Sequence, residues 1–247
     1  MTDHKHLPKP ADADDLKRVM AIYAHPDDPE FFSGGTLAKW ALEGKELIYV
    51  VATSGDKGTD DQDMTAQRLI EIREAEQRAA AKVTGGHTVT VIFLRYADGE
   101  LEPDLDLRRA LTRIIRLQKP DIVVTNDPAT RWFDSGSVNH PDHRAIGDAT
   151  LNAVYPSARD RHTFVELWRD EKLEPHKVRH IYLAGTREGD VKVDITDVLD
   201  RKIAAICEHK SQVKDVDALI KRQRDAFDPA YSPEKVYTET FRVLTLR

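Results

Sequence analysis

The sequence lacks the features that mark several classes of protein. It has one cysteine, Cys207, which excludes an internal disulfide and is typical of a reducing compartment. No apolar run is long enough to cross a membrane, and residues 1–18 have no hydrophobic segment of the secretory type. The formal net charge of −6 gives no basic footprint for nucleic acid. We therefore expect a cytoplasmic protein that binds neither nucleic acid nor a membrane.

The length and composition favour one domain with a substantial core. The chain has 247 residues, of which 40% are hydrophobic and 32% are charged, as in an ordinary globular protein. Residues 1–17 are polar and predict an N-terminal arm. Residues 18–247 predict a single domain.

Short apolar segments alternate with helical patterns along residues 18–247. The expected strands are 18–24, 46–53, 88–94, 121–125, 179–183, 191–195 and 238–246. The expected helices are 35–43, 65–83, 105–118, 140–154 and 198–212, followed by a charged amphipathic helix within 215–227. This alternation predicts an α/β fold with a mostly parallel central sheet and helices on both faces.

Polar clusters follow two of the expected strands. His25, Asp27 and Asp28 come directly after the first strand. The long polar loop 127–139 connects the strand 121–125 to a second cluster, NHPDHR, at residues 139–144. Because ligands bind at the carboxyl ends of strands in open α/β sheets, we expect both clusters at the same edge.

The second cluster has the pattern of a helix start. Pro141 suits the first turn, with Asn139 or His140 before it as a cap. His140 and His143 are three residues apart and can project from one face. The positive end of the helix dipole favours neutral imidazoles, as metal ligation requires. Asp142, in the same turn, can accept a hydrogen bond from a histidine ring and set its tautomer.

Together the clusters supply the donors of a metal site. His25, Asp28 and His143 form a two-histidine, one-carboxylate set that catalytic zinc uses with a position left open for water. Non-haem iron uses the same set, so the ligands leave Zn²⁺ and Fe²⁺ open. Each motif alone could be a turn or a helix start with exposed histidines. Their coincidence at one sheet edge favours the metal site.

Three further residues of these motifs suit acid–base chemistry. With one carboxylate used by the metal, Asp27 is free to take a proton from water. His140 can stabilise a developing oxyanion or protonate a leaving amine. We expect Asp142 to orient His140. The sequence thus predicts metal-assisted hydrolysis, in which a leaving amine could be protonated.

These motifs also resemble those of a known family, the PIG-L/LmbE-like N-deacetylases. The N-terminal signature of that family is similar to AHPDDPEFFSGGTLAKWALEGKELIYVVATSGDKG, and its second motif is similar to NHPDHRAIG. A later helix segment of the family is similar to KIAAICEHKSQV. The resemblance extends from about residue 19 to residue 213, and between the motifs it lies in the pattern alone.

The resemblance implies a fold, a cofactor and an activity. The family has a Rossmann-like three-layer sandwich, is mainly zinc-dependent, and removes acetyl groups from N-acetylglucosamine-containing conjugates. We therefore expect one Zn²⁺ per chain and a small N-acetylated sugar conjugate as substrate, and the resemblance also implies a possible homo-oligomer. Carried over by position, the roles are the same as those argued above: zinc ligands His25, Asp28 and His143, general base Asp27, and electrophilic or acid partner His140 supported by Asp142.

Three residues are candidates for substrate binding. Asp56 stands where the family often has glutamate, and its shorter side chain weakens any inherited contact. Arg73 matches a family arginine that can contact substrate, although a solvated helix charge paired with a glutamate fits equally. Arg131, with Trp132 and Phe133, could line a sugar pocket, and the alternative is that the aromatics anchor the loop.

Two other functions compete with deacetylation. A metal-dependent phosphoesterase would use the same groups, but many such enzymes hold a metal pair and the motifs supply one evident site. The other is a non-catalytic Rossmann-like module. A nucleotide-binding module would carry G-x-G-x-x-G after the first strand, where this chain has HPDDPEFFSGG. Intact acid and base residues argue against a metal-binding protein without catalysis.

Overall fold

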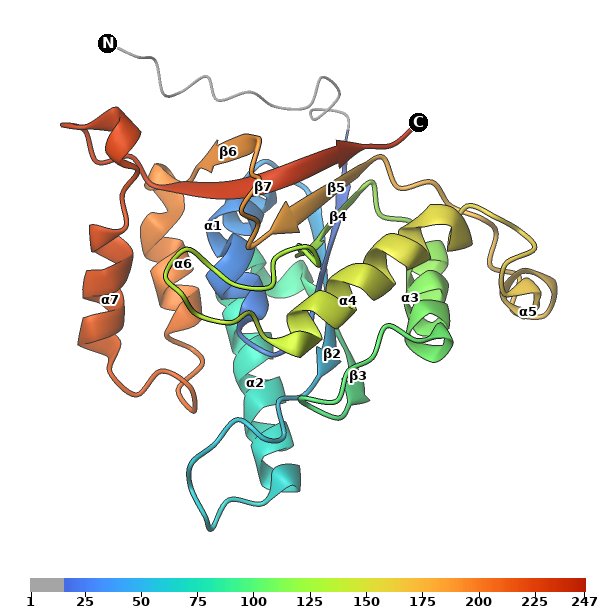
Figure 1. Ribbon diagram of the computed structural model, residues 1–247, viewed down its shortest axis with the longest axis horizontal. Helices are drawn as coiled ribbons and strands as arrows, with labels where there is room; N and C mark the ends of the chain where they lie inside the picture. The colour runs from blue at the N-terminus through green and yellow to red at the C-terminus, as the bar shows by residue number, and fades with distance from the viewer. Residues whose placement is uncertain (1–15) are drawn as a thin grey trace.

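Seven strands and seven α-helices form the framework of the residues that the computed structural model describes, 16–247 (Figure 1). The strands are β1 (Arg18–Tyr23), β2 (Glu46–Thr53), β3 (Thr90–Tyr96), β4 (Ile122–Asn126), β5 (His180–Ala184), β6 (Val191–Asp194) and β7 (Thr238–Thr245). The helices are α1 (Asp28–Leu42), α2 (Ala66–Gly85), α3 (Leu105–Gln118), α4 (Pro141–Asn152), α5 (Val165–Arg169), α6 (Leu199–Ile206) and α7 (Val216–Asp225).

The strands form one mixed sheet in the order β3–β2–β1–β4–β5–β7–β6. Strands β1 to β5 are parallel, and β7 runs antiparallel to both β5 and β6. Strand β1 is central and is buried from Val19 onward, because both of its faces are covered by helices. The expected α/β fold with a mostly parallel sheet is confirmed.

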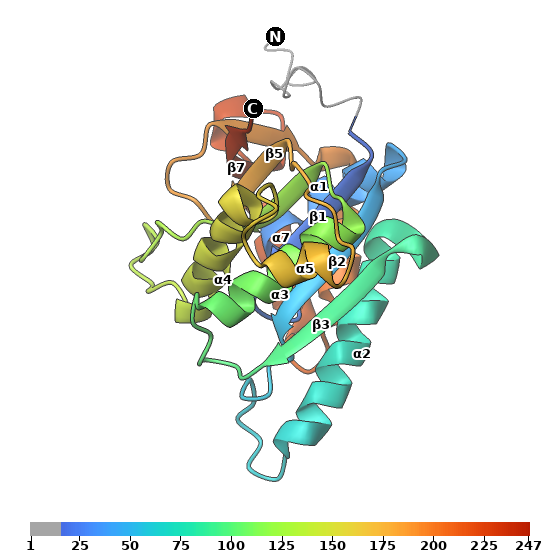
Figure 2. The ribbon, with the colours of Figure 1, turned by 90° about the vertical axis from the view of Figure 1, so that its right-hand side faces the viewer.

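Two layers of helices cover the sheet, each over its own apolar core. Figure 1 shows α1, α2 and α6 on one side and α3 and α4 on the other, and Figure 2 shows β3 as the outer strand beside α2. Leu37 and Trp40 of α1 pack with Tyr49 in the first core. Leu111 of α3 and Ile146 of α4 belong to the second core. The three-layer arrangement expected from the sequence is therefore present.

Helix α1 begins at Asp28, well before the expected start at residue 35. Pro29 stands in its first turn, where a proline sacrifices no helical hydrogen bond. Gly35 lies inside the helix. A Cβ at this position would come within 2.7 Å of the Ile195 side chain, which explains why the residue is glycine. This glycine therefore permits close packing and does not mark a boundary. As a result, Asp28 belongs to the first turn of a helix.

Helix α6 ends at Ile206, earlier than the expected residue 212. Downstream, the backbone N–H and hydroxyl of Ser211 both donate to Glu76 of α2, at 2.8 and 2.6 Å. These bonds hold the segment in turns that run back toward α2, so the expected long helix is wrong over its last residues.

The boundary of the predicted N-terminal arm lies close to where the description begins. Residues 1–15 of the arm are outside the described residues. Leu16 is buried, and the Lys17 N–H donates to the Asp121 carboxylate at 2.9 Å. Residues 16 and 17 therefore belong to the packed structure. Within residues 16–247, none of the helices has the length and apolar character needed to span a bilayer.

Candidate metal centre

The loops after β1 and β4 bring the two motifs together. Asp28 Oδ2 lies 3.3 Å from His25 Nδ1, and Asp28 Oδ1 lies 3.1 Å from His143 Nε2. The donor atoms of the three side chains all lie within 4.8 Å of one another. His25 and Asp28 are both buried. Two imidazoles and a carboxylate at this spacing could hold one metal ion.

The ring of His143 is oriented by Asn139. Its Nδ1 lies 3.0 Å from Asn139 Oδ1, and the Asn139 amide nitrogen donates to the Thr130 carbonyl at 2.8 Å. That second bond fixes which end of the amide faces the ring, so Nδ1 carries the proton when His143 is neutral. Nε2 is then left with its lone pair toward Asp28, as metal ligation requires.

The ring of His25 is oriented by two carboxylates. Its Nε2 lies 3.1 Å from Asp98 Oδ1 and 3.2 Å from Asp142 Oδ2. Nδ1 therefore faces Asp28 and the metal position. Asp98 is not among the site residues that the sequence motifs predict. It follows β3 at the same sheet edge as the two motifs, so the strand-end rule that found His25 could have found it.

The Asp142 carboxylate lies closer to His25 than to His140, the residue that we expected it to orient. Its Oδ1 is 4.0 Å from His140 Nδ1, whereas its Oδ2 contacts His25. The carboxylate is fully buried and accepts backbone N–H groups of Gly99 at 2.7 Å and Leu101 at 3.3 Å. In the first turn of α4 this side chain points toward the sheet, and so it reaches the strand-end loops and His25.

His140 caps helix α4 with its ring. Its Nδ1 accepts the backbone N–H of Asp142 at 3.2 Å, so the neutral ring carries its proton on Nε2. Burial, and then the positive charge of His25, lower the pKa of His140. The His140 and His25 rings meet edge to face at 4.7 Å between centroids. A neutral imidazole beside the metal position is suited to donate a hydrogen bond.

Asp27 lies beside the cluster without joining it. Its φ of 97° is in the left-handed region that non-glycine residues seldom adopt. Its Oδ2 accepts a hydrogen bond from Arg73 at 3.3 Å, and its backbone N–H donates to Gln77 Oε1 at 2.9 Å. Burial and the neighbouring Asp28 carboxylate raise the pKa of Asp27 to about 6, although Arg73 opposes them. The group is therefore a carboxylate poised near neutrality.

The charges around the cluster suit a cation. Burial would lower the pKa of His25, but the carboxylates of Asp142, Asp28 and Asp98 outweigh it and raise the pKa to about 12. Burial acts in the opposite direction on Asp28, and its two histidine neighbours hold the pKa of its carboxyl well below the usual range. Without a metal, a proton on His25 balances this negative charge. A bound cation would replace that proton, so the residues present fit a divalent metal.

Arg73 is buried rather than solvated. It is 4% exposed and donates to the carbonyls of Gly55 at 3.1 Å and Pro26 at 2.7 Å, as well as to Asp27. Gly55 has φ +66°, and a Cβ there would come within 2.1 Å of an Arg73 nitrogen. Gly55, the first of the two glycines in TSGDKG, therefore leaves room for the guanidinium. Arg73 therefore supports Asp27 through hydrogen bonds to its carboxylate and to the carbonyl of Pro26.

The other two substrate candidates, Asp56 and Arg131, have different surroundings. Asp56 Oδ1 accepts the backbone N–H of Asp98 at 3.0 Å and so supports the loop that orients His25. Arg131 is exposed and lines a cavity of about 430 Å³ together with Trp132 and Arg187. Trp132 is 55% exposed, so the alternative of a buried aromatic anchor is wrong for this residue. Substrate contact by Asp56 or Arg131 stays a prediction.

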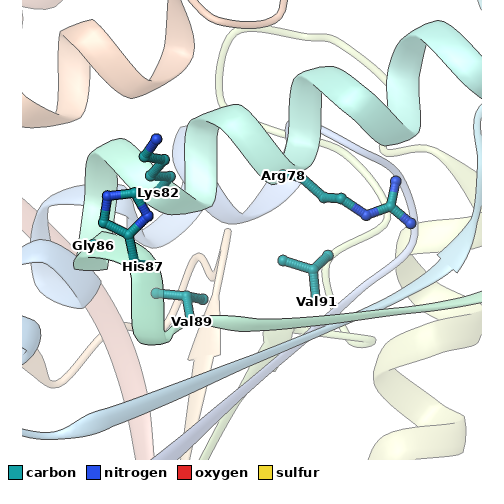
Figure 3. A pocket seen from close by; sticks show the side chains of 6 residues that line it. All are labelled: Arg78, Lys82, Gly86, His87, Val89 and Val91. Carbon is teal, nitrogen blue, oxygen red and sulfur yellow. The ribbon is translucent and has the colours of Figure 1, made fainter.

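A separate cavity of about 230 Å³ lies at the other end of β3 (Figure 3). Its walls include Lys82 and His87, which Figure 3 shows side by side, and Val89 and Val91 near the amino end of β3. Asp98, in contrast, follows the carboxyl end of that strand. None of the metal-cluster residues lines this cavity.

A comparison with known protein families covers both motifs in a single match. The family model described as GlcNAc-PI de-N-acetylase, PIG-L, matches residues 20–154, which include both histidine–aspartate motifs. The chain belongs to the PIG-L family. The resemblance seen in the sequence is therefore confirmed.

Relatives of this PIG-L chain include proteins named for deacetylation of amino sugars. A diacetylchitobiose deacetylase from Thermococcus kodakarensis is 30% identical, over 80% of this chain and 71% of the relative. A probable N-acetyl-alpha-D-glucosaminyl L-malate deacetylase 2 from Bacillus subtilis is 28% identical, over 80% of this chain and 84% of the relative. The solved N,N'-diacetylchitobiose deacetylase from Pyrococcus horikoshii matches with a TM-score of 0.82 and 31% identity, covering 94% of this chain and 85% of that one.

Proposed function

We propose that this protein is a metal-dependent hydrolase that removes the acetyl group from an N-acetylglucosamine-type conjugate, with one Zn²⁺ per chain. The relatives support the substrate class, because they are named for N-acetylated amino sugars. The site supports the chemistry through one observation. Asp27 is a poised, partly buried carboxylate beside a three-donor cluster in which it takes no part.

His25, Asp28 and His143 would hold the metal. When bound, a zinc ion supplies Lewis-acid chemistry, because it makes water more acidic and polarises a carbonyl. Asp27, as a carboxylate, takes a proton from water as the water oxygen attacks the acetamide carbonyl carbon. The Asp27 carboxyl then returns that proton to the departing nitrogen as the C–N bond breaks. The products are acetate and a primary amine.

His140 has a separate role in this proposal. Its neutral ring presents Nε2–H, because Nδ1 is occupied by the N–H of Asp142. The proton on Nε2 can bond to the carbonyl oxygen as negative charge develops there. Its lowered pKa favours this hydrogen-bonding role over that of a general acid at neutral pH.

A substrate screen tests the proposal. Metal-free protein, and protein reloaded with Zn²⁺ or Fe²⁺, would be incubated with N-acetylglucosamine, N,N'-diacetylchitobiose and N-acetylglucosaminyl malate, with acetate and primary amine assayed together. We expect equimolar release of both products, only after metal is restored. Release of phosphate from sugar phosphates without deacetylation would instead establish the phosphoesterase alternative. Thermal stabilisation by a nicotinamide dinucleotide without turnover would favour the binding module.

A further inference from the structure

The backbone of Asp27 is held from several sides. Its φ of 97° requires outside support, since a non-glycine residue does not adopt this conformation for its own sake. Its N–H donates to Gln77 Oε1 at 2.9 Å, and its carbonyl accepts the N–H groups of Glu30 at 3.0 Å and Phe31 at 3.1 Å. The conformation therefore depends on Gln77 presenting an oxygen at this point.

Glu30 determines how the Gln77 amide is turned. The Gln77 amide nitrogen donates to both carboxylate oxygens of Glu30, at 3.1 and 3.0 Å. An ionised carboxylate only accepts hydrogen bonds, so the nitrogen must face Glu30 and the oxygen must face Asp27. Both side chains are fully buried, which leaves water no access to relax this orientation.

His209 completes the arrangement from a distant part of the chain. Its Nε2 lies 3.1 Å from Glu30 Oε2, and the residue is fully buried in the turns that follow α6. A carboxylate buried this deeply is costly unless it is paired and hydrogen-bonded. With a proton on Nε2, His209 donates a hydrogen bond that favours the ionised, accepting form of Glu30.

We propose that His209, Glu30 and Gln77 form a positioning chain that holds Asp27 in the conformation needed to act on water. The inference rests on the proposed function, in which Asp27 is the general base. None of the three residues contacts the metal donors in the described structure, so they act through Asp27. Through this positioning chain, a residue of the loop after α6 helps to fix the conformation of Asp27, which follows β1.

A second buried ion pair, between Lys202 of α6 and Glu239 of β7, contacts the same helix α1 and provides a matched control. Lys202 donates to Glu239 at 2.6 Å, and Glu239 accepts the N–H groups of Gly35 and Thr36 in the middle of α1. Both members of this pair are buried, as are His209 and Glu30. Glu239 has no bond to Asp27. Loss of the Glu239 charge should therefore weaken the fold without disturbing Asp27, the proposed general base.

The kinetic test compares variants of His209 with that control. His209→Leu removes the donor to Glu30 and should lower kcat about 10- to 100-fold at unchanged KM and zinc content. His209→Gln should restore most of kcat, because an amide N–H lies near the position of Nε2. Glu239→Gln should lower Tm and leave kcat at the wild-type value. Equal loss of kcat in Glu239→Gln and His209→Leu would show general destabilisation and overturn the proposal.

A second readout is independent of turnover. Gln77→Met keeps the Glu30–His209 pair and removes only the acceptor of the Asp27 N–H. In zinc-loaded protein, amide exchange measured by NMR should be at least tenfold faster at Asp27 in Gln77→Met, and unchanged in Glu239→Gln. Unchanged exchange in Gln77→Met would overturn the positioning chain even if the protein is a deacetylase. Faster exchange in a protein that hydrolyses no acetamide would instead leave the chain standing and overturn the proposed function.

Discussion

The tripeptide His-Pro-Asp occurs twice at this site and adopts two different backbones. In the first copy, helix α1 starts only after Asp27, which is left outside the helix with φ 97°. In the second copy, helix α4 starts at Pro141, so Asp142 lies within its first turn. The Asp27 carboxylate of the first copy therefore contacts Arg73, and the Asp142 carboxylate of the second is buried against His25.

The residue after each tripeptide has the same task in the proposed site. Asp28 and His143 both point to the metal position, from the first turns of two helices on opposite faces of the sheet. The same three letters thus give different roles because the helix begins at different points relative to them. Variants at equivalent positions of the two copies can break this comparison or sharpen it.

The largest expected effect comes from removing a proposed ligand. His143→Ala should lose bound zinc and lower deacetylation by about 10⁴-fold or more, because several kcal/mol of metal catalysis disappear. Elemental analysis and an acetate assay would measure both. His87→Ala, an exposed histidine of the cavity in Figure 3, is the control and should behave as wild type. Full zinc content in His143→Ala would rule out its ligand role.

Asp27→Asn should have the next largest effect. The amide keeps the shape of the side chain but cannot take a proton, so kcat should fall by about 10²- to 10⁴-fold. Zinc content should stay at the wild-type level. Wild-type kcat in this variant would show that another group accepts the proton from water.

Asp142→Asn should have a smaller effect of a different kind. This change weakens the support of His25, so zinc affinity should fall about 10- to 100-fold. Competition with a chromogenic chelator would measure the dissociation constant. If Asp142 acted through His140 instead, kcat would fall while zinc affinity stayed constant, and the contact with His25 would lose its proposed importance.

The smallest effect concerns pH. Asp27 has a pKa raised to about 6 in the metal-free protein, and the ionised form is the one that accepts a proton. Activity should therefore fall as pH drops, by about tenfold per unit well below this pKa. A nearby metal cation lowers the pKa, so the acid limb should lie at or below 6. Arg73 also lowers the pKa of Asp27, so Arg73→Met should shift the acid limb of the pH profile to higher pH. A shift to lower pH would contradict the account.

Periodicity in the sequence was enough to predict most of the fold. The helix expected at 105–118 has the bounds of α3, and the strand-end rule brought His25 and His143 to one edge. The expected start of α1 at residue 35 is wrong, because Gly35 lies inside the helix and marks no boundary. Its neighbour Ile195 lies far away in the sequence and shows only in the fold why glycine is needed there.

The contacts between the motifs were harder to predict. The sequence indicated the three proposed ligands, since residue type and spacing carry that information. Asp98 and the partner of Asp142 depend on the loop after β3, which has no motif of its own. The burial of Arg73 depends on Gly55, which permits the guanidinium to approach Asp27. Such long-range contacts can be predicted only when the order and register of the strands are known.

The division of work between two adjacent carboxylates is the central claim, and zinc content tests it most directly. Asp27→Ala and Asp28→Ala would be loaded with zinc, desalted together with wild type, and analysed for bound metal. Asp27→Ala should retain about one zinc per chain, while Asp28→Ala should retain almost none. Equal retention in both variants, or equal loss, would contradict the assignment of Asp28 to the metal and Asp27 to water.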